Sequence, residues 1–574
     1  MGMYCITEAP SSSLAISFQQ EWLEDKEVAV GTVIPAAQPV NGQRQQHWPR
    51  LERAELFAQY QQLQAQGVSQ RQAAQILEVP RTTLQAWQAY QERLDEHPTV
   101  IAFFQSSPGL AFLHRLVIGL HQVCTEAGAC GIRLVCLLLR LAGLDRFVGA
   151  SYGSQQHVNH QVEDAIVTYR REESTRLAQD MPRKTINVAQ DETFTGGLCL
   201  VAIDLESNYI LLEQTAQGRD QDTWNGLMEQ ALAGLNCRVL QSTSDEAPGL
   251  LAYVAHHLDA HHSPDLFHMQ HELVKAVSGP LATKQRAALK AAAEAQAQLE
   301  QGHAPEQRET SSTEGQAASQ ELERISAQRD QVAQSIRRIS RLYHVVDLER
   351  GVRRNAPLIA TALREQVETI RTVAQAEGLS QSCVERIEKA ERVIPKMQAT
   401  IEFVSRYVHE EIRRLALEPP QAFAMHARLL PASYLERVAR TYTVSEGAPL
   451  RALAERLRTP LFEPGGALAG LEPARQQELQ QQAQRLAAVF QRSSSNVEGR
   501  NGCLSLRNHQ LRGLDRPRKR ECLTAIHNFF LTRADGTTAA ERFFGQKPRS
   551  MFAAVLDAVE IPPAPLSPPR RVQE

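Results

Sequence analysis

Three acidic residues stand far apart in the chain, each at the end of a predicted secondary-structure element. Asp191 closes an apolar run at residues 185–194, Asp245 follows a run at 237–242, and Glu498 opens a late helical segment. A carboxylate at the end of a buried strand needs a nearby cation, because partial withdrawal from water disfavours its charge. Brought together, three carboxylates offer hard oxygen ligands to Mg2+ or Mn2+, with two ions per site. Such an ion pair supports in-line displacement at phosphorus, because one ion activates the attacking oxygen and the other stabilises the leaving oxygen.

Neighbouring acids compete for these roles. Glu192 and Glu246 adjoin two of the candidates, but successive residues on a strand point to opposite faces, so only one of each pair should face a metal. Asp265 replaces Asp245 if the fourth strand is misplaced, and Glu541 is the alternative third acid.

Six histidines gather in residues 256–271. Zinc is not expected there, because the adjacent histidine pairs at a helix end point apart and no cysteine partner follows. His268 directly follows a candidate strand and is an accessory candidate for contact with a scissile phosphate, with a capping or core role as the alternative. Arg500 is the second accessory candidate.

The elements that position these residues form an alternating pattern. The order is three strands, a helix, a strand that ends at an acid, a helix and a short strand. The predicted strands are residues 185–194, 198–204, 209–213, 237–242 and 263–268, and the covering helices are 220–235 and 247–258.

The segment 51–94 has a helical pattern with clear stop and start signals. Helices are predicted at 51–66, 70–77 and 81–90. Gly67 ends the first helix and Ser69 caps the second, because glycine tolerates the left-handed conformation and serine bonds free amides. This spacing predicts a helix-turn-helix.

The start of its last helix presents polar side chains suited to phosphates and base edges in a major groove. Ile76, Leu84 and Trp87 are expected to be buried between the helices, and a plain three-helix bundle without a ligand is the alternative. The predicted DNA-binding residues are Arg81, Thr82, Thr83 and Gln85.

Composition sets further bounds on the protein. The 574 residues suffice for three or four domains, and 62 basic against 65 acidic residues give a net charge of −3, so any basic surface must come from local clustering. The nine cysteines form no Cys-x-x-Cys pair and no signal peptide is apparent, which favours a reducing, cytoplasmic setting. The apolar run 134–144 is too short to cross a bilayer and predicts a buried core helix.

Seven segments are predicted from these patterns. A second helix-turn-helix is weakly indicated within 145–157, basic residues precede the first strand and recur at 512–520, and polar breaks occur at 302–315 and 460–473. The segments are an irregular lead-in (1–48), the helix-turn-helix domain (49–97), a helical domain (98–180), the first part of the strand-bearing core (181–280), an all-helical insertion (281–488), the second part of the core with the third acid (489–560), and a Pro-rich tail (561–574).

Four motifs in this order resemble those of DDE-type transposases of bacterial insertion sequences. They are Asp-Glu-Thr-Phe at 191–194, Ser-Asp-Glu-Ala at 244–247, Asp-Leu-Phe-His at 265–268 and Ser-Asn-Val-Glu-Gly-Arg-Asn-Gly at 495–502. The resemblance implies a multidomain α and α/β protein whose ribonuclease H-like mixed-sheet core is interrupted by the helical insertion. It also implies that the first and fourth strands are neighbours.

By the same resemblance, Asp191, Asp245 and Glu498 form the catalytic and metal-binding triad. The N-terminal helices would bind the terminal repeats of a mobile element, and the core would cut them and join them to target DNA. A homodimer or larger homo-oligomer is expected, in the cytoplasm and on the nucleoid when bound to DNA, without a membrane. The alternatives are a transposase-derived regulator without catalysis, and a ribonuclease H-like nuclease that cuts without joining.

Overall fold

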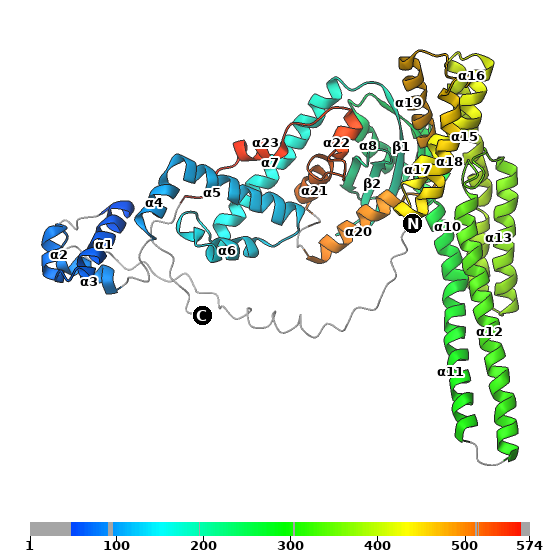
Figure 1. Cartoon of the computed structure of the whole chain (residues 1–574), viewed down its shortest axis with the longest axis horizontal. Coiled ribbons are helices and arrows are strands. Elements are labelled where there is room, and N and C mark those ends of the chain that lie inside the picture. The colour runs from blue at the N-terminus through cyan, green and yellow to red at the C-terminus, as the bar shows by residue number, and fades with distance from the viewer. Residues whose placement is uncertain are drawn as a thin grey trace. The chain divides into compact units, whose positions relative to one another are not determined.

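The computed structural model describes residues 48–89, 96–194, 196–301, 305–510, 514 and 516–563. The predicted lead-in, apart from Trp48, and most of the predicted tail lie outside these residues. The chain divides into two compact units, residues 1–110 with 566–574 and residues 111–565. Figure 1 shows the helices and strands of both.

The first unit contains three short helices, α1 (Arg50–Ala65), α2 (Gln70–Ile76) and α3 (Arg81–Ala89), followed by α4 (Pro98–Gln105). The predicted stop and cap are confirmed, because Gly67 has a φ of 82° and the Ser69 side chain accepts a bond from the Gln72 amide. Leu84 is fully buried and Trp87 packs edge-on against Phe57. The prediction for Ile76 was wrong, since it is 60% exposed.

The second unit begins with a series of helices that precedes the first strand. They are α5 (Ser107–Gly119), the π-helix η2 (Leu120–Ala127), α6 (Ile132–Leu141), the short η3 (Leu144–Arg146) and the 28-residue α7 (Tyr152–Gln179). The second helix-turn-helix predicted at 145–157 stays a prediction. Residues 152–157 form the first turns of α7, which Ser151 caps, and Gln155 is buried against His121.

A five-stranded mixed sheet lies at the centre of the second unit. Its strands are β1 (Lys184–Thr193), β2 (Cys199–Asp204), β3 (Ile210–Thr215), β4 (Cys237–Ser244) and β5 (His261–Pro264), in the order β3-β2-β1-β4-β5. The first three strands form an antiparallel meander, and β4 and β5 run parallel to β1. The expectation that the first and fourth strands are neighbours is confirmed.

Helices cover both faces of this sheet. On one face, Leu200, Ala202 and Leu212 pack against α8 (Gln221–Leu232) and α9 (Pro248–Tyr253), where Trp224 is completely buried. On the other face, Ala189 and Val201 pack against α20 (Ser495–Gln510). Side chains alternate along a strand, so residues 189 and 191 of β1 both point toward α20.

A large helical region separates β5 from α20. Its helices are α10 (Leu266–Leu273), η5 (Val274–Ser278), α11 (Gly279–Gln301), α12 (Pro305–Leu342), α13 (Ala356–Ala376), α14 (Gln381–Glu391), α15 (Ile394–Arg414), α16 (Pro419–Ala424), η6 (Met425–Leu429), α17 (Leu430–Ala439), α18 (Val444–Phe462) and α19 (Pro473–Val489). Most of the predicted linker at 302–315 is helical, because α12 begins at Pro305.

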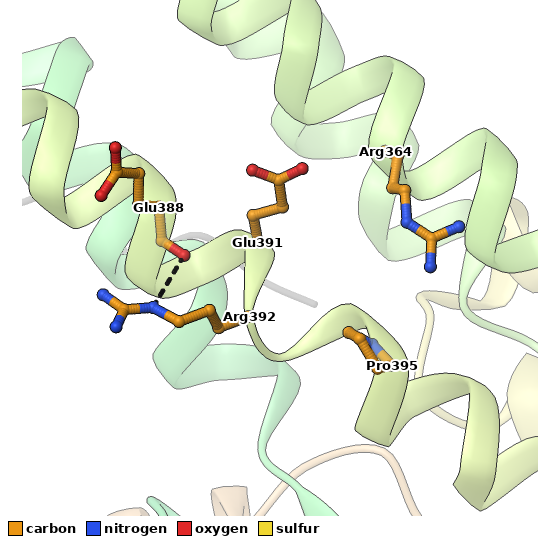
Figure 2. A pocket seen from close by; sticks show the side chains of 5 residues that line it. All are labelled: Arg364, Glu388, Glu391, Arg392 and Pro395. Atoms are coloured by element: carbon orange, nitrogen blue, oxygen red, sulfur yellow. Dashed lines mark hydrogen bonds between the residues drawn. The ribbon is translucent and has the colours of Figure 1, made fainter.

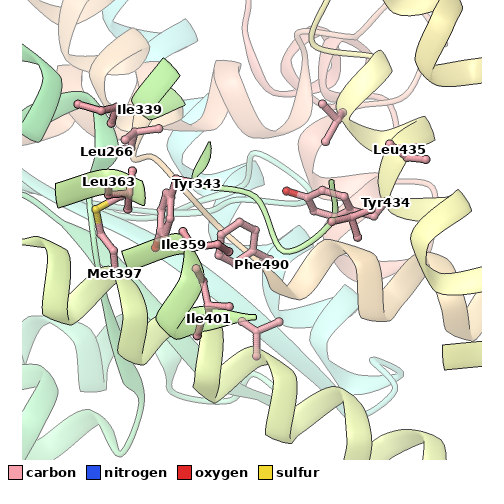
Figure 3. Packing of buried hydrophobic residues seen from close by; sticks show 14 of the residues in the cluster. Leu266, Ile339, Tyr343, Ile359, Leu363, Met397, Ile401, Tyr434, Leu435 and Phe490 are labelled. Atoms are coloured by element: carbon pink, nitrogen blue, oxygen red, sulfur yellow. The ribbon is translucent and has the colours of Figure 1, made fainter. Parts of the chain in front are cut away.

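This region has its own apolar core, in which Tyr343, Ile359, Met397 and Phe490 come from distant segments (Figure 3). The core also includes the buried face of α10, so the helical region fixes the helix that carries His268. A depression lined by Arg364, Glu388, Glu391, Arg392 and Pro395 lies on its surface (Figure 2), and none of the residues predicted for chemistry line it.

The chain then returns to the sheet. After α20 come α21 (Pro517–Phe529), α22 (Ala539–Phe544) and α23 (Met551–Ala558). Among the residues that the structure describes, no single helix has both the length and the apolar composition to cross a membrane; residues 98–105 and 107–127, bent by 76°, meet the criteria only as a pair.

Candidate functional site

The end of β1 directs two adjacent carboxylates to opposite sides of the sheet. Asp191 lies on the face covered by α20, where the Asn501 Nδ2 donates to Asp191 Oδ2 over 2.7 Å. Glu192 lies on the other face and forms an ion pair of 3.1 Å with Arg219, which precedes α8. The alternation of the strand therefore separates the two acids, as the sequence predicts.

The surroundings of Asp191 disfavour the ionised form of its carboxyl group. Its residue is only 8% exposed, and burial raises its pKa to about 7, helped by the negative charges of Glu498 and Asp245. The Glu192 backbone amide donates to Asp191 Oδ1 over 2.8 Å and opposes that rise. A cation bound between a buried carboxyl and its acidic neighbours would favour the ionised form of that carboxyl.

Two further elements, β4 and α20, carry the other two acids. Asp245 directly follows β4, is exposed, and accepts a bond from the Ala247 amide. Glu498 lies in the first turn of α20, and burial together with the charges of Asp265 and Asp245 raises its pKa. The three predicted acids therefore act electrostatically on one another although about 250 residues separate Asp245 from Glu498 in sequence.

Asp265 and His268 form a second pair beside Glu498. The predicted strand at 263–268 was placed too late, because β5 ends at Pro264 and Asp265 caps α10. Asp265 Oδ2 accepts from Ser494 Oγ at 2.5 Å and contacts His268 Nδ1 at 2.9 Å. His268 Nε2 lies 3.6 Å from Glu498 Oε1, and its pKa is raised by the bond to Asp265.

Ligand atoms of Asp265, His268 and Glu498 lie within 4.8 Å of one another, a spacing that one cation could bridge. Asp265, the predicted alternative to Asp245, belongs to this set, whereas Asp191 and Asp245 do not. An exposed phenylalanine, Phe267, stacks on His271 next to this cluster at a ring distance of 5.6 Å.

The structure does not place Arg500 and Glu541 at the cluster. The Arg500 guanidinium makes two bonds, of 2.6 and 2.8 Å, to the buried Glu213 carboxylate on β3. Glu541 lies on α22, whose Phe543 carbonyl accepts a bond from Lys184 at the start of β1. Asp191 is at the other end of that strand, so Glu541 is remote from the acids.

The remaining histidines of residues 256–271 have structural partners. His261 stacks on Phe403 with a ring distance of 4.3 Å, and His262 Nε2 lies 2.9 Å from Ser244 Oγ. Burial lowers the pKa of both to about 4, which keeps them neutral.

The basic segments that flank the core are largely neutralised within the chain. Lys519 lies 2.6 Å from Glu126 and 3.0 Å from Glu163, and Arg518 pairs with Asp164 at 3.1 Å. Arg171 pairs with Glu521. Residues 512, 513 and 515 of the predicted basic stretch lie outside the described residues.

The predicted DNA-binding residues lie at the start of α3 in the first unit. Arg81, Thr82 and Gln85 are exposed and Thr83 is half-buried. Gln85 Nε2 donates to Gln70 Oε1 over 3.3 Å, which ties α3 to α2.

Three polar residues that bond to the acids went unpredicted. They are Asn501 and Ser494, which bond to Asp191 and Asp265, and Arg219, which pairs with Glu192 on the other face of the sheet. The first two lie in the Ser/Asn/Gly-rich stretch around Glu498, whose unusual polarity before a helix was the only local signal. Arg219 carries no signal in sequence, since its contact with Glu192 depends on how α8 packs on the sheet.

A family of unknown function, DUF6399, matches residues 425–571, about a quarter of the chain. The matched segment contains Glu498 and Asn501 but neither Asp191 nor Asp245. The comparisons with curated proteins and with solved structures gave no match.

Proposed function

We propose that this protein is a DNA transposase of the DDE type, which cuts the ends of a mobile element and joins them to target DNA. The observation that carries the proposal is the convergence of Asp191, Asp245 and Glu498 from three distant elements. Burial, with the negative charges of the other two acids added to it, raises the pKa of Asp191 to about 7. A structural role alone does not account for three acids whose charges act on one another, because uncompensated like charges destabilise a fold.

The sheet supports the same proposal. An antiparallel meander of three strands followed by two strands parallel to the first is the arrangement of a ribonuclease H-like core. Asp191 and Asp245 lie at the same edge, since the carboxyl ends of the parallel neighbours β1 and β4 coincide. The helical region between β5 and α20 corresponds to the insertion.

The donor set fits divalent metal ions. Carboxylate oxygens are the ligands that Mg2+ and Mn2+ prefer, and an imidazole beside them is compatible with Mn2+. Asp191, Asp245 and Glu498 would bind two such ions, with Asp265 and His268 at the margin of the site. Bound ions would supply activation of the attacking oxygen and stabilisation of the leaving one.

Hydrogen bonds within the chain orient the acids of this site. Asn501 and the Glu192 amide fix the two oxygens of Asp191, and Ser494 with His268 fixes Asp265. Cleavage adds a water oxygen to the scissile phosphorus and releases a DNA 3′-hydroxyl. Joining adds that 3′-oxygen to a target phosphorus and breaks the target strand at that phosphorus. Both steps are therefore displacements at phosphorus by an oxygen nucleophile.

The first unit would bind the element ends. Arg81, Thr82, Thr83 and Gln85 at the start of α3 suit a recognition helix in the major groove, and the capped turn at Ser69 has the form of a helix-turn-helix. The partners in this proposal are the terminal repeats, target DNA and further copies of the chain, in the cytoplasm.

Labelled duplexes taken from the DNA that flanks the gene test this proposal. With Mg2+ or Mn2+, the wild-type protein should produce nicked ends and joined products, and Asp191→Ala, Asp245→Ala and Glu498→Gln should each abolish both while retaining end binding. Glu541→Gln is the matched control and should cut normally, because Glu541 lies at the far end of β1.

Cleavage that survives in a triad variant would remove that residue from the site. Cutting without joining by the wild type would favour a nuclease, and binding without cutting would favour a regulator without catalysis. Either result would overturn the proposed transposase.

A further inference from the structure

An aromatic side chain is exposed beside the acid cluster, on the outer face of α10. The inner face of this helix is buried in the core of the helical region, whereas Phe267 is 43% exposed. Its neighbour in sequence is His268, whose Nε2 lies 3.6 Å from Glu498 Oε1. Phe267 therefore stands next to the cluster without offering it a ligand.

Two imidazole rings hold the Phe267 ring in place. The ring of His271, one helical turn further on, stacks on it with centroids 5.6 Å apart and planes inclined by 25°. The ring of His268 lies at 84° to it, with centroids 5.7 Å apart. Because the residue stays 43% exposed, these contacts leave part of the ring open to a further planar group.

Positive side chains lie beside these rings. Lys275 on η5 and Arg386 on α14 both act on His271 as positive charges, and Glu272 opposes them. The Glu272 carboxylate is shared, because Arg386 and Lys389 lie 2.7 and 3.1 Å from its two oxygens. Burial and the neighbouring cations lower the pKa of His271, so its ring is mostly neutral at pH 7. The surface thus combines neutral aromatic rings with cations.

This combination suits an unpaired nucleobase. Every base has a π-face that can stack on an aromatic side chain, and cations beside the ring contact the phosphates. In an intact duplex the neighbouring base pairs cover the faces of each base, so a base must leave the stack before it can reach a protein ring. Phe267 and Lys275 lie eight residues apart, about 12 Å along the helix, which is roughly three to four nucleotides of a stacked strand.

We propose that Phe267 stacks on an unpaired base of the DNA strand that enters the acid cluster, and that Lys275 and Arg386 contact the phosphates of nearby nucleotides. This inference rests on the proposed function for the identity of the strand, and it adds that the DNA is locally single-stranded at the cluster. The surface lies within the second unit, so its test needs no contact with α3.

Photochemical cross-linking tests the stacking directly. A single-stranded oligonucleotide with one central 5-iodouracil is irradiated with the full-length protein in the presence of Ca2+, and the cross-linked residue is located by mass spectrometry. The cross-link should form at Phe267, persist in Phe267→Tyr, which keeps an aromatic ring, and be lost in Phe267→Leu. Phe423→Leu is the matched control and should leave the cross-link unchanged, because Phe423 is 70% exposed on α16 and is no part of this surface.

The affinity for the same oligonucleotide measures the strength of the contact. Phe267→Leu should weaken binding of the single strand roughly 5- to 100-fold, because one stacked base is lost, and should leave the affinity for a duplex of the same sequence unchanged. Lys275→Ala should lower the steepness of the salt dependence by about 0.7, the value for one phosphate contact on a single strand. Lys290→Ala on α11, whose charge is paired with Glu294, should change neither quantity.

No binding of the single strand, no cross-link at Phe267, or equal affinities of the wild type and Phe267→Leu would each overturn this inference. An equal loss of duplex affinity in Phe267→Leu would assign the surface to double-stranded DNA and would overturn it as well. The proposed function is judged separately by cutting and joining. Cross-linking at Phe267 without cutting would refute the transposase and leave this surface as a site for single-stranded nucleic acid.

Discussion

The affinity of the protein for Mn2+ should depend steeply on pH, because Asp191 must lose its proton to bind a metal. Its pKa is raised to about 7, so it is mostly protonated below that pH and mostly ionised above it. A group of this pKa is about 9% ionised at pH 6 and about 91% ionised at pH 8. The affinity for Mn2+ should therefore rise at least about tenfold between these values, and more if Glu498, whose pKa is also raised, binds the same ion.

Chelator-treated, DNA-free protein titrated with Mn2+ by calorimetry at pH 6, 7 and 8 measures this effect. Proton release should accompany binding at pH 6 and nearly vanish at pH 8. Asp191→Asn should lose both the tight binding and the proton release, and Asp557→Asn, on the exposed side of α23, should keep both. An affinity that is constant from pH 6 to pH 8 would refute the assignment of a raised pKa to a metal-binding Asp191.

Two further outcomes follow from the contacts. Arg500→Leu leaves the Glu213 carboxylate buried without the cation that pairs with it, and should lower the free energy of unfolding by about 3–5 kcal/mol. Thermal unfolding measures this loss, with Arg183→Leu at an exposed position as the control. An unchanged unfolding midpoint in the Arg500 variant would contradict the structural role. Arg81→Ala should weaken binding to element-end DNA about 10- to 100-fold and lower its salt dependence, whereas Gln64→Ala on α1 should not. Equal affinities in a binding titration would exclude α3 as the recognition helix.

Much of the local structure was predictable because it depends on near neighbours in sequence. The turn at Gly67 and the cap at Ser69 follow from the conformational freedom of glycine and from the hydroxyl that bonds the Gln72 amide. The first four strands were located from their apolar runs, and the alternation of side chains correctly separated Asp191 from Glu192.

Predictions failed where partners come from elsewhere in the fold. The leucines of α6 are apolar enough to suggest a core, but only the packing of η2 and α7 decides which face is covered. Helical period alone likewise could not show that residues 305–315 continue into α12, because polar residues suit an exposed helix as well as a linker.

The sequence by itself predicted the candidate acids, and it located the strands that Asp191 and Asp245 end and the helix that Glu498 opens. Only the tertiary structure decided that Asp265 and His268 join Glu498, and that Arg500 belongs to Glu213 instead. The reason is physical: period and capping are set by residues within a few positions, whereas the partner of a buried charge is set by which strands and helices pack together. Asn501 reaches Asp191 across 310 positions of sequence, a contact that depends on α20 packing across the end of β1.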